Sequence, residues 1–402
     1  MTAGAAVMWQ EDKSAGLVRR IHEDALTVLA EAGVHCRSPE VRNLFADTGL
    51  AALDETSGNI HVLPELVSQA LSLAPGRSEF WVPADSFGIG GTAPFVYDDD
   101  LGDLITPTFG HLETIATAAQ EADCVSFMAR GVLLPKREAE VMETMIARCR
   151  KPIYVAAVTP EGIARAGEIA RSRSGLVVQF SIITSPLTVM ESMIPPFLSC
   201  VKNNTPVYLS TMPMAGLTGP YSMSSLVTLT HAEALFGITL AQLLHPGITV
   251  VHAGLPSITD ISKSYALDMG SAAHNLANLL MAKVGESLDL PSIQTACTTN
   301  AERPGLQAER DACLGFSLCK RHGFHQMRHC FGFLKDLVGF SIKKLRRGIE
   351  ICMEATAEDS PPYHFEAYDP EGLAAILRNG SRAGYRSDPH TLKNVGERFT
   401  SA

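Results

Sequence analysis

The chain has 402 residues, of which 46% are hydrophobic and 19% charged, the balance of a globular protein with a large core. A formal net charge of −10 without a basic patch argues against a nucleic-acid partner. No unbroken apolar segment has the length of a transmembrane helix, and the first residues lack the pattern of a secretory signal. We therefore expect a cytoplasmic protein with no membrane partner.

The nine cysteines are scattered, odd in number and without a C-x-x-C pair. This pattern indicates reduced thiols in a cytosol and not a disulfide framework or a structural zinc site.

The first hundred residues predict a helical cap. Apolar residues recur at helical spacing over 15–33, a second helix is predicted after Ser38-Pro39, and a third is predicted over 64–73. The segment 86–103 is rich in Gly, Pro and Asp, so it is interpreted as strands and turns that join the cap to the main body. Its cluster Gly88-Ile89-Gly90-Gly91 precedes no helix and is interpreted as a turn, with a phosphate-binding loop as the alternative.

From about residue 124, short apolar segments alternate with amphipathic helices, which is typical of a parallel sheet covered on both faces. The predicted strands are 124–130, 153–158, 176–183, 206–211, 248–253, 292–298 and 324–331. The predicted helices between them are 136–149, 160–173, 189–203, 222–244, 263–285 and 303–322. Consecutive units of this kind favour an α/β fold closed into a (β/α)8 TIM-type barrel, although the eighth strand is not located. An open doubly wound sheet is the alternative.

The predicted organisation is thus an N-terminal helical cap with connecting strands over 1–110, followed by the barrel domain with C-terminal helices over 111–402. In such barrels the active site lies at the carboxyl ends of the strands. This rule selects Ser185, Thr188, Met212, Met214, His252, Asp260, Thr298, Thr299, Asn300, Glu302, His329 and Cys330.

A metal site is the alternative interpretation of His322, His325 and His329, because two of them would share one face of a helix. A strand is predicted there and no carboxylate accompanies them, so we predict no metal. Other chemistry is weakened by what is absent. No lysine ends a predicted strand as a Schiff-base aldolase requires, and no nucleophile elbow or P-loop occurs.

The order of segments resembles the trimethylamine methyltransferase family over almost the whole chain. The matching motifs are IHEDALTVLAEAGVHCRSPEVRNLFADTGL at 21–50, TSPLT at 184–188, MPMAGLTGP at 212–220, HAEALFG at 231–237, AQLLHPGITVVHAG at 241–254 and SRAGYRSDPHTL at 381–392. The resemblance implies a (β/α)8 barrel that moves a methyl group from a methylated amine to the cobalt of a corrinoid (cobalamin) carried by a partner protein, with no tightly bound cofactor. It also implies a homo-oligomer.

The segment TACTTNAERPGLQAE contains no pyrrolysine or similar residue, so the chain resembles the branch similar to glycine betaine:corrinoid methyltransferases. The substrate implied is a small quaternary amine or related onium compound. Its demethylation expels a neutral tertiary amine and needs no general acid, so the protein has to position the cation in a desolvated pocket of aromatic faces and a carboxylate.

On this resemblance the predicted catalytic residues are His329, Glu233 and Asn300, with His329 also nearest the corrinoid. The predicted substrate-binding residues are Tyr97, Tyr208, His252, Asp260, Phe331 and Met212.

Structural alternatives accompany these assignments. Tyr208 is equally interpretable as core, Glu233 as a buried carboxylate bonded to a loop, and Asp260 as the N-cap of a helix from Ile261. Met212 is alternatively a gap-filling side chain, and Tyr97 rests on the resemblance alone.

The segment RHCFGFLKDL departs from the family pattern, because Phe331 and Phe333 replace small residues and would reshape the pocket. Two alternative functions therefore stay open. One is a lyase or hydrolase that acts on a related small molecule without corrinoid, and the other is a non-catalytic onium-binding protein.

Overall fold

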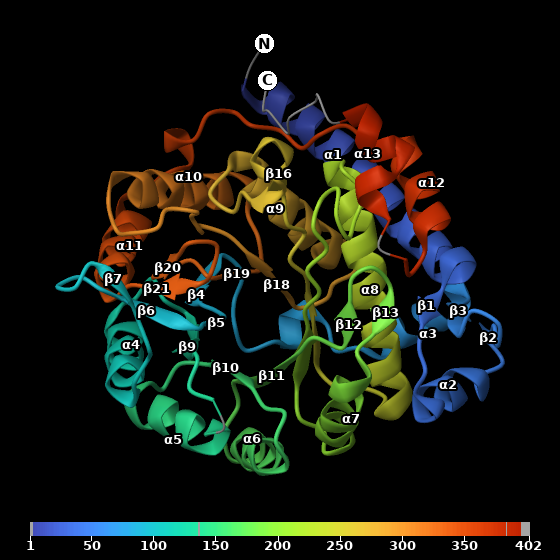
Figure 1. Cartoon of the computed structure of the whole chain (residues 1–402), viewed down its shortest axis with the longest axis horizontal. Helices are drawn as coiled ribbons and strands as arrows, with labels where there is room; N and C mark the ends of the chain where they lie inside the picture. Colours follow the sequence, from blue (N-terminus) through green and yellow to red (C-terminus); the bar gives the residue numbers. More distant parts are fainter. Residues whose placement is uncertain (1–2, 136, 383, 395–402) are drawn as a thin grey trace.

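Eight parallel strands close into a barrel at the centre of the molecule (Figure 1). The computed structural model describes residues 3–135, 137–382 and 384–394. The barrel strands in chain order are β4 (Ser86–Ile89), β8 (Phe127–Ala129), β10 (Ile153–Ala156), β11 (Leu176–Phe180), β14 (Val207–Leu209), β15 (Val250–Ala253), β18 (Ser292–Thr295) and β19 (Gln326–Arg328). Each pairs with the next, and β19 closes the barrel on β4. The predicted (β/α)8 fold and its seven predicted strands are confirmed.

The first barrel strand, β4, is the strand that sequence reasoning did not locate. It begins inside the segment predicted to connect the cap, so the barrel starts at Ser86 and not at residue 111, and the interpretation of the glycine cluster as a turn is wrong for Gly88 and Ile89. A Cβ on Gly88 would lie 2.3 Å from the Phe127 ring, and one on Gly90 would lie 2.5 Å from the Cβ of Arg328. The glycines are therefore required for close packing inside the barrel, although glycine in a sequence favours a turn.

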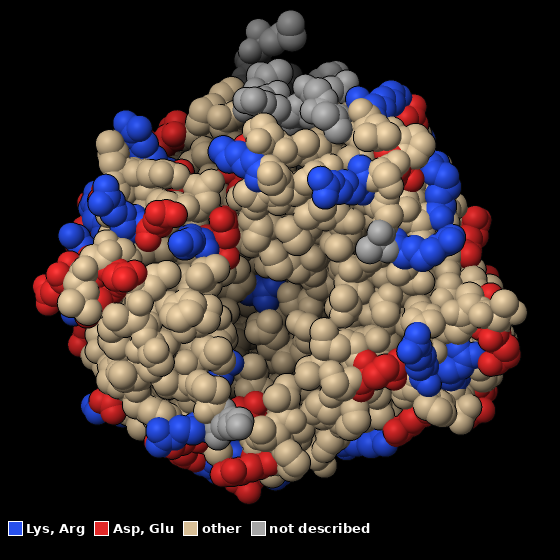
Figure 2. Space-filling view, in the orientation of Figure 1, with Lys and Arg blue, Asp and Glu red and all other residues tan. Residues whose placement is uncertain are grey.

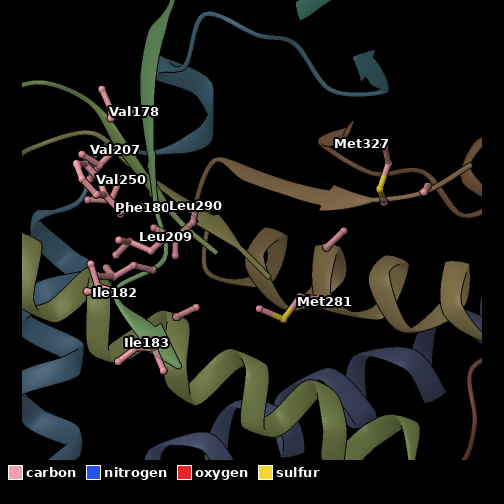
Figure 3. Close-up of a cluster of buried hydrophobic side chains, with 14 of the residues drawn as sticks. Val178, Phe180, Ile182, Ile183, Val207, Leu209, Val250, Met281, Leu290 and Met327 are labelled. Atoms are coloured by element: carbon pink, nitrogen blue, oxygen red, sulfur yellow. The ribbon is translucent and has the colours of Figure 1, made fainter. Parts of the chain in front are cut away.

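The barrel strands alternate between an inner and an outer apolar face. Inward side chains include Phe127, Tyr154, Tyr208 and Val251, which form one buried cluster. Their neighbours along the strands belong to the core between the barrel and the helices, as Figure 3 shows for Val178, Phe180, Val207, Leu209 and Val250. Burial on both faces explains why the sequences of these strands are continuous hydrophobic runs.

Helices follow the strands and form the outer layer (Figure 1). They are α4 (Phe109–Glu121), α5 (Glu138–Arg148), α6 (Pro160–Ser172), α7 (Ile194–Lys202), α8 (Met223–Leu244), α9 (Ala272–Ser287), α10 (Leu306–His322) and α11 (Ile342–Glu354). By length and composition α8 could cross a membrane, but 94% of its apolar window is buried in the structure. It packs against α1, α3, α9 and α12 as well as β15, so its apolar surface is covered on all sides.

The cap that covers α8 comes from both ends of the chain. Its helices are α1 (Ala3–Thr27), the short π-helix η1 (Val28–Ala32), α2 (Pro39–Ala46), α3 (Pro64–Leu73), α12 (Pro370–Asn379) and α13 (Pro389–Asn394). The three predicted N-terminal helices are confirmed, and Ser38 caps α2 by accepting a hydrogen bond from the Val41 amide. A sheet in the order β12-β13-β1-β3-β2 ties the cap to the loop after β11. Its strands are β1 (Val34–His35), β2 (Ala51–Leu53), β3 (Asn59–Val62), β12 (Ile183–Thr184) and β13 (Thr188–Val189).

The loops after the first and last barrel strands pair with each other at the carboxyl-terminal end of the barrel. They form a sheet of β6 (Phe95–Asp98), β7 (Asp103–Ile105), β20 (Phe333–Leu334) and β21 (Gly339–Phe340). Two further pairs lie in such loops, namely β5 (Thr92–Ala93) with β9 (Gly131–Val132) and β16 (Thr259–Asp260) with β17 (Ala266–Leu267).

Candidate active site

Arg328 is the only Asp, Glu, Lys or Arg in the eight barrel strands, all of which the structure describes. It ends β19, it is 1% exposed, and its side chain crosses the interior. Nη1 donates a hydrogen bond to the Tyr208 hydroxyl at 3.2 Å, and Nη2 donates to Ser210 Oγ at 2.7 Å and to the Gly254 carbonyl at 3.2 Å. Its Nε is buried with no hydrogen-bond partner among the described residues.

A second arginine, Arg130, follows β8 at the same end of the barrel. Its Nε donates a hydrogen bond to Thr92 Oγ1 at 3.0 Å. Burial lowers the pKa of Arg130, an effect that Glu138 and Tyr208 oppose. Glu138 is already engaged, since its carboxylate accepts hydrogen bonds from the Val158 and Thr159 amides.

Neither guanidinium has a carboxylate partner within the described part of the chain: their hydrogen bonds go to hydroxyl and carbonyl oxygens. Figure 2 shows a hollow at the centre of this face, above the barrel, with a basic side chain visible inside it. The candidate site is therefore a cationic hollow at the carboxyl ends of the strands, where barrels of this type bind their ligands.

His329 follows Arg328 and leaves the regular strand. Its φ of 63° lies in the left-handed region, and its Nδ1 is 3.0 Å from Thr295 Oγ1. Burial and the neighbouring Arg328 lower the pKa of His329 well below its ordinary value, so the imidazole is neutral at pH 7. Gly91 makes room for it, since a Cβ there would lie 2.4 Å from Nε2 of His329. The imidazole of His329 is neutral and held in place. It is therefore suited to position a bound ligand, and not to contact the ligand through a positive charge.

Tyr208 and His329 are the predicted residues that the structure brings to the same end of the interior, joined through Arg328. Tyr208 lies in β14, is 1% exposed, and its ring centroid is 5.2 Å from Cζ of Arg328. Because the Tyr208 ring already contacts the guanidinium of Arg328 beneath the hollow, it is poorly placed to bind the cation of an onium substrate as well.

Glu233 lies in α8, outside the barrel interior, and clamps the loop after β11. One carboxylate oxygen accepts a hydrogen bond from Ser185 Oγ at 2.7 Å and the other from the Leu187 amide at 2.9 Å. Burial raises the pKa of Glu233 to about 7. The arrangement matches the alternative of a buried carboxylate that holds a loop.

His252 and Phe331 face away from the interior, contrary to the substrate-binding role expected of them. His252 alternates with the inward Val251 and Ala253, and its Nε2 is 3.0 Å from Nδ1 of His231 in α8. Phe331 packs on Phe316 of α10 with a centroid distance of 5.5 Å. His252 faces the helix layer because side chains alternate along β15. Phe331 faces it because the chain turns after β19.

The other predicted residues lie in the surrounding loops. Asp260 caps the short helix over 261–263 by accepting from the Ser262 amide, as its structural alternative states. Asn300 accepts from Gln307 and contacts Asp268, and Met212 is 37% exposed after β14. Tyr97 lies in β6 and packs on the small apolar cluster of Ala301, Ala308 and Leu334.

The three histidines considered for a metal are dispersed. His322 packs on Phe365 with the rings tilted, His325 bonds the Val82 carbonyl through Nε2, and of the three only His329 reaches the interior. Within the described residues, no group of three potential metal ligands occurs.

The arginines are the residues that sequence reasoning missed. Both stand in predicted strand segments, in CVSFMAR and FHQMRHCF, and both lie at or just beyond the carboxyl end of a strand. A charged residue inside an otherwise buried strand was the available signal, because fully buried arginine is rare unless it is paired.

The closed barrel with a hollow at the carboxyl ends of its strands defines a (β/α)8-barrel enzyme. The family model described as trimethylamine methyltransferase (MTTB) matches residues 10–402, so the chain belongs to this family and is a methyltransferase.

Several characterised relatives are similar to it. A glycine betaine methyltransferase of Desulfitobacterium hafniense is 24% identical over 95% of this chain and 84% of its own length. Trimethylamine methyltransferase MttB of Methanosarcina barkeri is 24% identical over 85% and 77%. The proline betaine:corrinoid methyltransferase of Eubacterium limosum is 23% identical over 72% and 66%. Among solved structures, monomethylamine methyltransferase of Methanosarcina barkeri covers 96% of this chain and 84% of its own at 12% identity, with a TM-score of 0.47.

Proposed function

We propose that the enzyme demethylates a small quaternary amine or related onium compound and passes the methyl group to a corrinoid carried by a partner protein. Two relatives are named for betaine substrates and one of these for corrinoid, which supports this choice within the family. The segment 295–309 contains only standard residues, so the pyrrolysine-free branch fits.

The observation that carries the proposal is the lack of carboxylates and lysines in the barrel strands. The eight strands contain no Asp, Glu or Lys, and burial keeps His329 neutral, so its imidazole does not deliver a proton as a general acid at pH 7. Hydrolases and lyases commonly use such a group to protonate the atom that leaves. Methyl transfer from a quaternary ammonium does not need one, because the leaving amine is neutral. The strands therefore favour methyl transfer over the corrinoid-independent alternatives.

The residues of the chain then have to bind, orient and desolvate the substrate. A reduced corrinoid supplies the nucleophile when its carrier protein docks, and the hollow at the barrel end leaves the substrate open from that side (Figure 2). The Gly90-Gly91 segment and Thr295 fix His329 beside this opening, so we propose that His329 positions the substrate against the corrinoid. Tyr97 and Met212, both in loops at this end, are the proposed outer contacts to the cation.

The test is methyl transfer from glycine betaine to a corrinoid protein held in the Co(I) state. Loss of the Co(I) absorbance that depends on both enzyme and substrate supports the proposal. Demethylation or cleavage of the substrate without corrinoid would favour the lyase or hydrolase, and tight binding without any turnover would favour the binding protein.

We also propose that the enzyme works in the cytoplasm, which agrees with the nine free cysteines. The homo-oligomer stays a prediction, to be checked by light scattering.

A further inference from the structure

The buried Arg328 lacks the counter-charge that its environment requires. A guanidinium stays protonated inside a protein, and moving it out of water costs several kcal/mol unless an anion accompanies it. Arg328 is 1% exposed, and among the described residues its partners are two hydroxyls and a carbonyl. These neutral acceptors satisfy hydrogen bonds and leave the charge uncompensated.

Arg130 adds a second cation to the same place. Arg328 ends β19 and Arg130 follows β8, and these two strands flank β4 in the barrel. The segment after β4 contacts both side chains, because Gly90 lies against the stem of Arg328 and Thr92 accepts a hydrogen bond from Arg130. Arg130 uses only Nε for hydrogen bonding within the described residues, to Thr92, and Arg328 has its Nε without a partner. Two guanidinium groups that share a neighbour and have donors to spare form a receptor for a planar oxyanion.

We infer that Arg328 and Arg130 bind the carboxylate of the substrate, which is therefore a carboxylated quaternary amine and not a simple methylamine or an amino alcohol. This inference rests on the proposed function for the identity of the cationic part. The carboxylate lies at the floor of the hollow, over Tyr208 and Ser210. The ammonium end is repelled by the same arginines and points to the open mouth. That orientation presents an N-methyl carbon to the side from which the partner protein approaches.

The packing around Arg328 supports a built site. Gly90 is needed for the stem of Arg328, since a Cβ would lie 2.5 Å from the Cβ of the arginine. Ser210 and the Gly254 carbonyl then hold Nη2 from two further strands. The guanidinium is thus fixed before any ligand arrives, which lowers the entropic cost of binding.

The experiment compares three ligands by calorimetry on the whole protein without corrinoid. Glycine betaine has both charges, tert-butylacetate has the carboxylate with an uncharged isostere of the ammonium group, and choline has the cation with a hydroxyl. We expect glycine betaine to bind at least about tenfold more tightly than choline, because a charge-assisted pair is worth about 1.5–3 kcal/mol and every 1.4 kcal/mol is tenfold. Arg328→Gln and Arg130→Gln should each weaken glycine betaine and tert-butylacetate by about tenfold or more and leave choline unchanged or improved.

Arg171→Gln is the matched control, because Arg171 is an exposed arginine in the last turn of α6 and its loss changes the net charge equally. It should leave all three affinities within about twofold, well below the tenfold change that each 1.4 kcal/mol produces. If Arg328→Gln fails to fold, the wild-type ligand comparison and Arg130→Gln still decide the outcome.

Each outcome decides between the two proposals. Equal affinity for choline and glycine betaine, or binding of neither carboxylate, overturns the anion site, whatever the methyl-transfer assay shows. Carboxylate binding that is lost with the arginines, together with no methyl transfer, supports the anion site and rejects the proposed reaction.

Discussion

Arg328 lies against Tyr208 across the barrel interior, with Nη1 donating to the phenolic oxygen at 3.2 Å and Cζ 5.2 Å from the ring centroid. The phenol therefore accepts a hydrogen bond from a charged donor and also presents its face to that charge. This contact joins β19 to β14 and holds the guanidinium beneath the hollow.

Tyr208→Phe tests the strength of this contact. We expect the free energy of unfolding to fall by about 1.5–3 kcal/mol, because hydrogen bonds to charged groups contribute that much. Tyr154→Phe is the matched control: Tyr154 is also a buried barrel tyrosine, but its hydroxyl bonds the neutral Gln326, so a loss of about 1 kcal/mol is expected. Denaturant unfolding measures both, and an equal or larger loss in Tyr154→Phe would contradict the assigned role of the charge.

His329→Ala should abolish methyl transfer and leave substrate binding detectable. The imidazole is neutral and fixed at Thr295, so its proposed task is to position the substrate against the corrinoid. Calorimetric binding and the Co(I) absorbance assay, run on the same preparation, separate the two effects. Retained turnover rejects the role of His329.

Gly91→Ala should lower the free energy of unfolding by more than the strain of an alanine at positive φ alone would. Gly91 has a φ of +66°, and a Cβ there would meet Nε2 of His329 at 2.4 Å. Gly49→Ala is the control, because Gly49 has a φ of +67° and nothing within 4 Å of the added Cβ. We expect about 1 kcal/mol of destabilisation in the control and at least about 2 kcal/mol in Gly91→Ala, measured by denaturant unfolding. Equal losses would show that His329 moves freely.

Glu233→Gln should flatten the pH dependence of stability. Burial raises the folded-state pKa of Glu233 to about 7 from an ordinary value of 4.5. The folded protein then holds this proton more tightly than the unfolded chain. Its contribution is fully present below the unfolded pKa and is lost as the pH rises through 7. Between pH 5 and pH 8 the free energy of unfolding of the wild type should fall relative to the variant by an amount on the order of 3 kcal/mol, since each pKa unit is worth about 1.4 kcal/mol. Parallel curves for the two proteins would disprove the titration of Glu233.

Tyr97→Ala should weaken binding of a quaternary ammonium by about 1–2 kcal/mol if its ring contacts a desolvated cation. The binding constant for choline is the suitable readout, because it contains no carboxylate contribution. Circular dichroism checks that the β6 sheet is intact, and unchanged affinity in a folded variant removes Tyr97 from the site.

Local signals in the sequence determined much of the fold. The apolar runs of β10, β11, β14 and β15 are buried on both faces, so they are recognisable without knowledge of their partners. The Ser38-Pro39 cap is likewise local, because its hydrogen bond spans three residues.

Only the tertiary structure decided which side chains meet. Gly88 belongs to a strand because β4 pairs with β8, and it has to be glycine because the Phe127 ring, 39 positions away in the sequence, occupies the space that a Cβ would need. The outward position of His252 depends on which alternate residues of β15 face the interior, and the closure of the barrel decides this. Arg130 and Arg328 become one cationic site only when strands from the two ends of the barrel sequence lie on either side of β4. The sequence thus determined the elements and the family. The charge at the floor of the hollow, in contrast, is held by contacts between residues 38 to 120 positions apart, which no local pattern encodes.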